Sequence, residues 1–315
     1  MKNLLRRLLL LVPMLLLISI GTFLLVDLVP GDPAIQIAGA EATAEEYAEI
    51  REQLNLDEPL PVRYVHWLGD AVTGDLGRSI TVPSQTVVER LTEALPVNLE
   101  LAGLALLLAV MVSVPLALLS AYWSGGRFDR VTSSTMFAMI SVPNFLVGIL
   151  VLLLFGVHLQ WFPIGQWARP SEYGLIDNLR YAMLPILTLA IGEIAIFTRL
   201  LRADLMQTLR EDFILSARAK GMPTGHILLR EALRPSLSSL LTMAGLSLGR
   251  LIGGSVIVEK IFALPGMGTA IVDGARSSDY TLVQGGVLVI ALVYVTANLS
   301  VDALHAYVDP RTRNA

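Results

Sequence analysis

One continuous apolar stretch decides the fold class: residues 97–122 read VNLELAGLALLLAVMVSVPLALLSAY. A helix needs roughly 20 mostly apolar residues to cross about 30 Å of hydrocarbon, and this stretch is longer. Its apolar residues follow one another without alternation, whereas the strands of a membrane β-barrel alternate apolar and polar residues. We therefore predict a membrane-spanning α-helix here.

Five further stretches of the same kind occupy residues 8–29, 132–157, 183–201, 237–258 and 282–303. The composition agrees, because 54% of the 315 residues are hydrophobic and only 16% are charged. Soluble domains are about 45–50% apolar and about 25% charged. The sequence predicts an all-α polytopic membrane protein with six transmembrane helices.

The first apolar stretch has a second interpretation as a secretory signal peptide, with residues 38–40 (AGA) as the cleavage site. A signal peptide has an apolar region of roughly 7–15 residues, and the stretch at 8–29 is longer. We therefore expect a retained helix.

Charge and cysteine content exclude several classes of protein. The net charge is −4, which gives no electrostatic footprint for nucleic acid. No cysteine is present, so disulfides, thiolate metal sites, iron–sulfur clusters and cysteine nucleophiles are excluded. The four histidines lie far apart in the sequence, and we expect no metal site.

Basic residues predict the orientation in the membrane. Lysine and arginine concentrate in the N-terminal residues, after the second and fourth stretches, and in the C-terminal tail. Cytoplasmic segments carry this excess. Both termini and residues 202–236 are therefore predicted to be cytoplasmic, and residues 30–96 extracytoplasmic.

The outer segment, residues 30–96, is predicted to be structured. Thr43 and Glu46 have capping-box spacing at the start of a helix. A second short helix carries Tyr64 and Leu68. The segment is either a small cap over the membrane domain or a docking surface for a partner, and both interpretations stay open.

The inner segment, residues 202–236, reads as a helical hairpin. Residues 204–215 extend the fourth helix. Gly221-Met222-Pro223 forces a break, since glycine admits positive φ and proline lacks a backbone donor. Residues 226–233 form a second helix that ends near Pro235. The hairpin is either a solvated loop or a docking element for a cytoplasmic partner.

The hairpin carries two motifs, ARAKG at 217–221 and REALR at 230–234. Other motifs occur in order along the chain: VPGDP (29–33), LDEPLPVRY (56–64), GDLGRS (74–79), VEKIF (258–262), LPGMG (264–268) and VDPR (308–311). Together they resemble the permeases of ABC importers, and more narrowly the B-type subunit of the dipeptide/oligopeptide/nickel permease family. The resemblance covers nearly the whole chain.

The resemblance implies a single permease domain, residues 1–315, in the bacterial inner or plasma membrane, which moves short peptides by alternating access. The permease would not be an enzyme: no lysine lies in a phosphate-binding loop, and ATP with Mg²⁺ would be used by partner subunits. The implied partners are a second homologous permease, two cytoplasmic ATPases and an extracytoplasmic substrate-binding protein. Nickel or another small solute is the alternative substrate. An ion-coupled secondary transporter is less favoured. It would have broken helices at corresponding places in two inverted halves, and the sequence shows no such repeat.

The resemblance also assigns ATPase docking to the hairpin, as the cytoplasmic coupling-helix loop between helices four and five. The docking residues it implies are Glu211, Asp212, Ala217, Arg218, Ala219, Lys220, Gly221, His226 and Arg230. Two positions depart from the family pattern. Leu215 stands where the pattern has a glutamate, and the proline usual later in the next span is absent, Pro235 being the nearest.

Two charges fall within predicted spans. Glu193 lies near the middle of the fourth and Arg250 near the middle of the fifth. Intramembrane charges are costly, so they pair or line an aqueous cavity. Either role, pathway lining or an internal ion pair, fits the sequence. Glu100 and Glu259, at span ends, are expected to need no special role.

Residues 245–249 (GLSLG) match the serine-hydrolase motif GxSxG. That motif needs a strand–turn–helix context, and here it lies inside a predicted span. Gly245, Gly249 and Gly253 are spaced four apart, which allows a neighbouring helix to approach closely. We therefore predict helix packing rather than catalysis.

Overall fold

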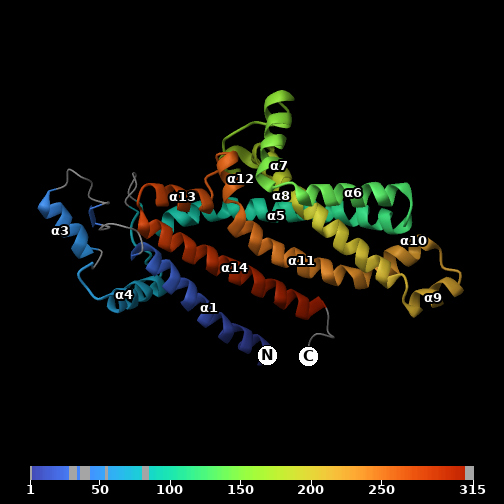
Figure 1. Cartoon of the computed structure of the whole chain (residues 1–315), viewed down its shortest axis with the longest axis horizontal. Helices are drawn as coiled ribbons and strands as arrows, with labels where there is room; N and C mark the ends of the chain where they lie inside the picture. Colours follow the sequence, from blue (N-terminus) through green and yellow to red (C-terminus); the bar gives the residue numbers. More distant parts are fainter. Residues whose placement is uncertain (1, 28–33, 36–42, 54–55, 80–84, 309–315) are drawn as a thin grey trace. The chain divides into compact units, whose positions relative to one another are not determined.

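The computed structural model describes residues 2–27, 34–35, 43–53, 56–79 and 85–308. These residues are mainly helical (Figure 1), and their β-structure is one isolated antiparallel bridge between Arg78 and Thr86. The alternative signal cleavage site at residues 38–40 lies outside the described residues, as does the side chain of Glu46 in the predicted capping box.

The helices follow one another with short connections. In chain order they are α1 (Lys2–Asp27), α3 (Ala44–Gln53), α4 (Leu60–Thr73), α5 (Val87–Tyr122), α6 (Arg127–Ser141), α7 (Asn144–Val151), the π-helix η1 (Leu152–His158), α8 (Pro170–Thr208), α9 (Asp212–Ala219), α10 (Thr224–His226), the π-helix η2 (Ile227–Ala232), α11 (Leu233–Gly254), α12 (Val256–Ile261), α13 (Met267–Arg276) and α14 (Tyr280–Val308).

The apolar helices agree with the predicted polytopic fold. Within the described ranges, four are long and apolar enough to cross a membrane: α5, α8, the helix Thr224–Gly254 and α14 over Tyr280–Ser300. The pair of α6 with residues 144–158 supplies a fifth, and α1 a shorter apolar helix, Val12–Leu24. Each falls on one of the six predicted stretches, which confirms the all-α membrane fold.

The third predicted span, residues 132–157, is wrong as a single straight helix. The chain bends by 103° between α6 and α7. Val142 is extended there (φ −88°, ψ 126°), and Pro143 precedes the first turn of α7. The proline ring disfavours helical backbone in the residue before it, which accounts for the bend.

The chain forms two compact units, residues 1–97 with 265–295, and residues 98–264 with 296–315. In the first unit the outer segment packs on α1. The Phe23 ring contacts Tyr64 edge-on at a centroid distance of 5.5 Å, and Trp67 at 5.8 Å. The hydroxyls of Ser19 and Tyr64 share a hydrogen bond of 2.8 Å. The predicted second short helix is thus confirmed as α4, and its aromatic face lies against α1.

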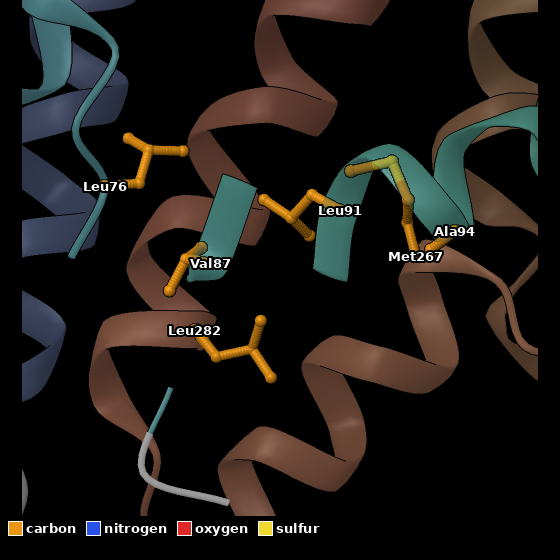
Figure 2. Packing of buried hydrophobic residues seen from close by; sticks show 6 residues of the cluster. All are labelled: Leu76, Val87, Leu91, Ala94, Met267 and Leu282. Atoms are coloured by element: carbon orange, nitrogen blue, oxygen red, sulfur yellow. The ribbon is translucent and has the colours of Figure 1, made fainter. Parts of the chain in front are cut away.

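A small apolar core ties the start of α5 to α13 and α14 (Figure 2). Its buried side chains are Leu76, Val87, Leu91, Ala94, Met267 and Leu282. Burying a large aliphatic side chain contributes about 1.5–3 kcal/mol.

A capping box starts α5: Glu89 N–H donates to Thr86 Oγ1 (3.2 Å), and Thr86 N–H donates to a Glu89 carboxylate oxygen (3.0 Å).

In the second unit α8 is the central helix, and α6, α7 and α11 all pack against it. Small residues allow close approach. A side chain at Gly148 of α7 would meet Thr188 of α8 at 3.1 Å, and one at Gly192 of α8 would meet Asn144 at 3.2 Å. The buried face of α8 includes Phe197, which has no exposed surface.

Candidate functional site

The hairpin (residues 202–236) begins with a break that the sequence interpretation missed. Residues 204–215 do not extend one helix, because α8 ends at Thr208 and α9 begins at Asp212. Glu211 between them is extended (φ −71°, ψ 151°). Asp212 then lies in the first turn of α9, where its charge complements the helix dipole. The break turns Ile214 inward, where it is fully buried.

The predicted break at Gly221 is confirmed. Gly221 has φ +74°, a left-handed conformation that glycine adopts without steric cost. Its N–H donates to Arg218 O (2.9 Å), and Met222 N–H donates to Ala217 O (3.2 Å), so the last carbonyls of α9 are satisfied. Pro223 then precedes the first turn of α10.

The second arm of the hairpin does not end near Pro235 as predicted. One helix runs from Thr224 to Gly254, through α10, η2 and α11. Pro235 lies in the first turn of α11, directly after the π-helical residues of η2. A π-helix has i→i+5 hydrogen bonds, so the regular α-helical pattern starts again at Leu233, two residues before Pro235, and a proline is tolerated in a first α-helical turn. The second arm of the hairpin and the fifth membrane helix are therefore parts of one continuous helix.

The hairpin has a closed face and an open face. Ile214 and Ala217 of α9 and Ile227, Leu228 and Ala232 of η2 are buried. Of the predicted docking residues, those with exposed side chains or backbone are Glu211, Asp212, Arg218, Ala219, Lys220, Gly221 and Arg230; His226 is half-buried. Ala217 is therefore part of the closed face.

Three large apolar side chains, which sequence reasoning did not select, are exposed on the hairpin. They are Phe213 (46% exposed), Leu215 (54%) and Leu229 (59%). Leu215 is one of the two positions at which the chain departs from the family pattern. Phe213 and Leu215 lie on either side of the buried Ile214 on α9, so the open face combines apolar side chains with both signs of charge over the exposed width of the hairpin.

Two contacts connect the helices that leave the hairpin. The hydroxyls of Thr208 in α8 and Ser236 in α11 share a hydrogen bond of 3.1 Å. Farther along, α11 packs against α8 more extensively than any other helix pair among the described elements. Movement of the hairpin would therefore displace α8 and α11 together.

An ion pair, also absent from the sequence predictions, joins α6 to the C-terminal part of α8. Arg202 donates from Nε to Asp129 Oδ1 (2.5 Å) and from Nη2 to Asp129 Oδ2 (2.8 Å). Gly125 N–H donates to the same carboxylate (2.9 Å). One turn earlier, the Arg199 guanidinium lies 4.1 Å from the centroid of the Phe137 ring. Both arginines therefore hold α6 against α8.

The two intramembrane charges meet. Arg250 Nη2 donates to Glu193 Oε1 at 2.6 Å, and Ser247 Oγ donates to Glu193 Oε2 at 2.7 Å. The sequence left an internal ion pair and a role in the pathway as alternatives; the two side chains form an ion pair here, and a role in the pathway stays a prediction. The helices approach closely here, since Gly245 and Gly249 are buried and Gly253 is half-buried.

The residues around Ser247 are helical throughout, so the strand–turn–helix context of a serine nucleophile is missing. Both oxygens of Glu193 are occupied, one by Ser247 and one by Arg250. The arrangement orients a cation and stabilises helix packing. It does not resemble a hydrolase site.

Glu259 was expected to need no special role at a span end, but the structure buries it completely. It is fully buried in α12, and its Oε1 accepts hydrogen bonds from Asn98 Nδ2 (2.7 Å) and Ser255 Oγ (2.6 Å). Asn98 Nδ2 also donates to Ile252 O at 3.2 Å. A buried carboxylate is tolerated only when it is hydrogen-bonded, and these bonds join α5 to α11 and α12.

Comparison with known proteins gives matches along the whole chain. The family described as binding-protein-dependent transport system inner membrane component matches residues 113–314, and the description of its N-terminal part matches residues 1–102. A putative peptide transport system permease protein of Brucella abortus is 38% identical, over 96% of each chain. The oligopeptide transport system permease protein AppB of Bacillus subtilis is 35% identical, over 97% of each chain. The glutathione transport system permease protein GsiC of Escherichia coli is 36% identical, over 98% of this chain and 97% of the relative.

Two solved structures share the fold. One is the MetNI methionine ABC transporter in inward facing conformations, with a TM-score of 0.55, 16% identity, and coverage of 70% of this chain and 96% of that chain. The other is an amino acid ABC transporter with histidines, with a TM-score of 0.51, 20% identity, and coverage of 71% and 94%.

Proposed function

Because the chain belongs to the family of binding-protein-dependent transport system inner membrane components, we propose that it is the B-type permease subunit of an ATP-driven importer of short peptides. The observation that carries the peptide assignment is the end-to-end match to relatives named for peptides, oligopeptides and glutathione. These names favour a peptide over nickel or another small solute.

The working complex we propose has a second homologous permease, two cytoplasmic ATPases and an extracytoplasmic substrate-binding protein. ATP and Mg²⁺ are bound by the ATPases. The permease lies in the bacterial inner membrane as one functional domain, with both termini and the hairpin (residues 202–236) in the cytoplasm. The excess of lysine and arginine in these segments supports this orientation.

The open face of the hairpin is the proposed ATPase-docking surface. Phe213, Leu215 and Leu229 supply apolar contact area. Arg218 and Arg230 are exposed beside them and can pair with acidic groups of a partner. Apolar side chains surrounded by charges are typical of the core and rim of a protein interface.

The proposed mechanism is alternating access. Closure of the ATPases on ATP displaces the hairpin. The Thr208–Ser236 hydrogen bond and the packing of α11 on α8 pass the displacement to both helices together. The Arg202–Asp129 ion pair connects α8 to α6, so α6 would move together with α8 and α11. Packed helices transmit such a shift because their interior is densely filled.

The test replaces Leu215 by serine and measures two quantities: the amount of ATPase that copurifies with the permease, and the uptake of a radiolabelled dipeptide by cells. Removing an apolar interface contact should reduce both severalfold. Val72→Ser is the matched control, because Val72 is an exposed aliphatic side chain (80%) on the outer segment. Normal ATPase recovery with Leu215→Ser would refute the docking surface. Competition of uptake by nickel chelates but not by peptides would refute the peptide assignment.

A further inference from the structure

Arg250 is paired and exposed at the same time. The side chain of Glu193 is 4% exposed, whereas that of Arg250 is 57% exposed. In the described part of the chain, both hydrogen bonds of Arg250 start at Nη2, one to Glu193 (2.6 Å) and one to Ser247 (3.3 Å). The donors on Nε and Nη1 therefore remain for another acceptor. A guanidinium carries five N–H donors in a planar fork.

The face of α11 that Arg250 occupies differs from the exposed faces of other spans. Successive exposed residues at helical spacing on α11 are Ser239, Thr242, Leu246, Arg250 and Gly254, and Ile257 of α12 follows them. The corresponding stripe on α5 is Gly103, Leu107, Met111, Pro115 and Leu119. The α5 stripe lacks polar side chains and suits contact with lipid. The α11 stripe carries three polar side chains, Ser239, Thr242 and Arg250, so it is less suited to contact with lipid than the α5 stripe.

Arg250 is more than half exposed, and its guanidinium is paired with Glu193, which lies near the middle of the predicted span 183–201. A cation at that depth does not face lipid at low cost. Its long side chain could reach an interface from a helix end, but Arg250 is held at mid-span by Glu193 and Ser247. The exposed half of the guanidinium therefore requires water or a polar group beside it in the assembled transporter.

We propose that Arg250 is a carboxylate-binding group of the translocation pathway, and that Glu193 and Ser247 are positioning residues that hold its guanidinium at mid-span. This inference rests on the proposed function, since the solute it identifies is the free C-terminal carboxylate of a short peptide. A guanidinium with two free donor nitrogens matches the two oxygens of a carboxylate.

The pairing with Glu193 also explains why binding would be transient. The buried carboxylate neutralises the net charge of the site, so an anionic group gains hydrogen bonds but little long-range attraction. Passage through a membrane pathway requires binding that is favourable enough to enter and weak enough to leave. An unpaired arginine would hold the carboxylate more strongly.

The experiment measures initial uptake of trialanine and of its C-terminal amide. Proteoliposomes contain the whole transporter, and saturating binding protein is preloaded with each peptide. We expect the wild-type transporter to move the acid roughly tenfold faster than the amide, the effect of losing one charge-assisted hydrogen-bonded contact. The double variant Glu193→Gln/Arg250→Gln leaves no buried charge, and we expect an acid-to-amide ratio near one.

Two further variants keep the test decisive. Arg250→Lys retains the cation without the planar fork and should keep part of the preference, even if the double variant is inactive. Arg234→Gln removes an exposed arginine from the same helix and should keep the full preference. Equal rates for both peptides in the wild type, or a full preference in Arg250→Lys and in the double variant, would overturn the proposal.

Assembly separates this proposal from an interface role. If the double variant no longer copurifies with the second permease, Arg250 belongs to the subunit interface and the proposal is wrong. Failure of the proposed function would look different, because the wild-type transporter would then take up neither peptide.

Discussion

Replacing Arg202 by methionine should destabilise the protein more than any loss of an exposed arginine. Asp129 keeps only 6% of its side chain exposed, and Arg202 donates to both of its carboxylate oxygens. Methionine retains much of the apolar stem of Arg202 but offers no donor. Asp129 then keeps the single N–H of Gly125 and loses its ion-pair partner, with the charge of Arg130 still nearby.

The magnitude follows from burial. Removing one partner of a fully buried ion pair costs about 3–5 kcal/mol. The Arg202 side chain is 30% exposed, so water partly replaces it, and one hydrogen bond to Asp129 survives. We therefore expect a loss of about 2–3 kcal/mol in the free energy of unfolding, near the upper end for an unsatisfied buried polar group.

A double-mutant cycle checks this estimate by unfolding the purified permease in detergent with increasing SDS. Asp129→Asn/Arg202→Met should lose less stability than the two single variants together, with a coupling energy of about 1–3 kcal/mol. Arg210→Met is the control, because Arg210 is exposed near the end of the same helix, and its effect should stay within about 0.5 kcal/mol. Additive effects, or an Arg202→Met as mild as Arg210→Met, would refute the reasoning.

Three other predictions concern single positions. Gly221→Ala forces a side chain into φ +74° and should lower hairpin stability by about 1 kcal/mol, measured as faster proteolysis in this loop, whereas Gly225→Ala, with open space around it and no positive φ, should not. Thr86→Ala removes one half of the capping box of α5 and should cost about 1 kcal/mol in the same SDS titration; an unchanged midpoint would show that the cap adds nothing. A cysteine replacing Glu45 should react with an impermeant thiol reagent in intact cells and one replacing Thr224 should not, and the opposite pattern would reverse the orientation.

The positions of the apolar helices were predictable because each depends only on local sequence. A run of about 20 apolar residues must satisfy its backbone as a helix in lipid, wherever its neighbours lie. The break at Gly221 was equally local. The bend before Pro143 could also have been predicted, since the residue before a proline avoids helical backbone. The apolar residues continue on both sides of Pro143, however, and the stretch was therefore interpreted as one straight helix.

The hairpin was harder to predict, because its boundaries depend on packing. The interruption between Thr208 and Asp212 has no glycine or proline, and the helix that follows it places Ile214 in a fully buried position. Conversely, a proline such as Pro235 usually marks a helix end. Here the helix continues from the π-helical residues of η2 directly into α11, which contains Pro235 in its first turn. Local propensity is a weak prior that tertiary contacts override.

Buried charge marks the limit of sequence reasoning, and the two buried glutamates show why. Glu193 was recognisable because it stands inside an apolar run, where a charge is costly in any arrangement. Its pairing with Arg250 was one of two options, since it depends on the rotation of α8 against α11. Glu259 lies outside the apolar core of its span, so nothing local marks it as buried. It is fully buried, and one of its hydrogen-bond donors is Asn98, which is 161 positions away in the sequence. Whether a charged residue near a helix end is buried therefore depends on the side chains that neighbouring helices pack against it.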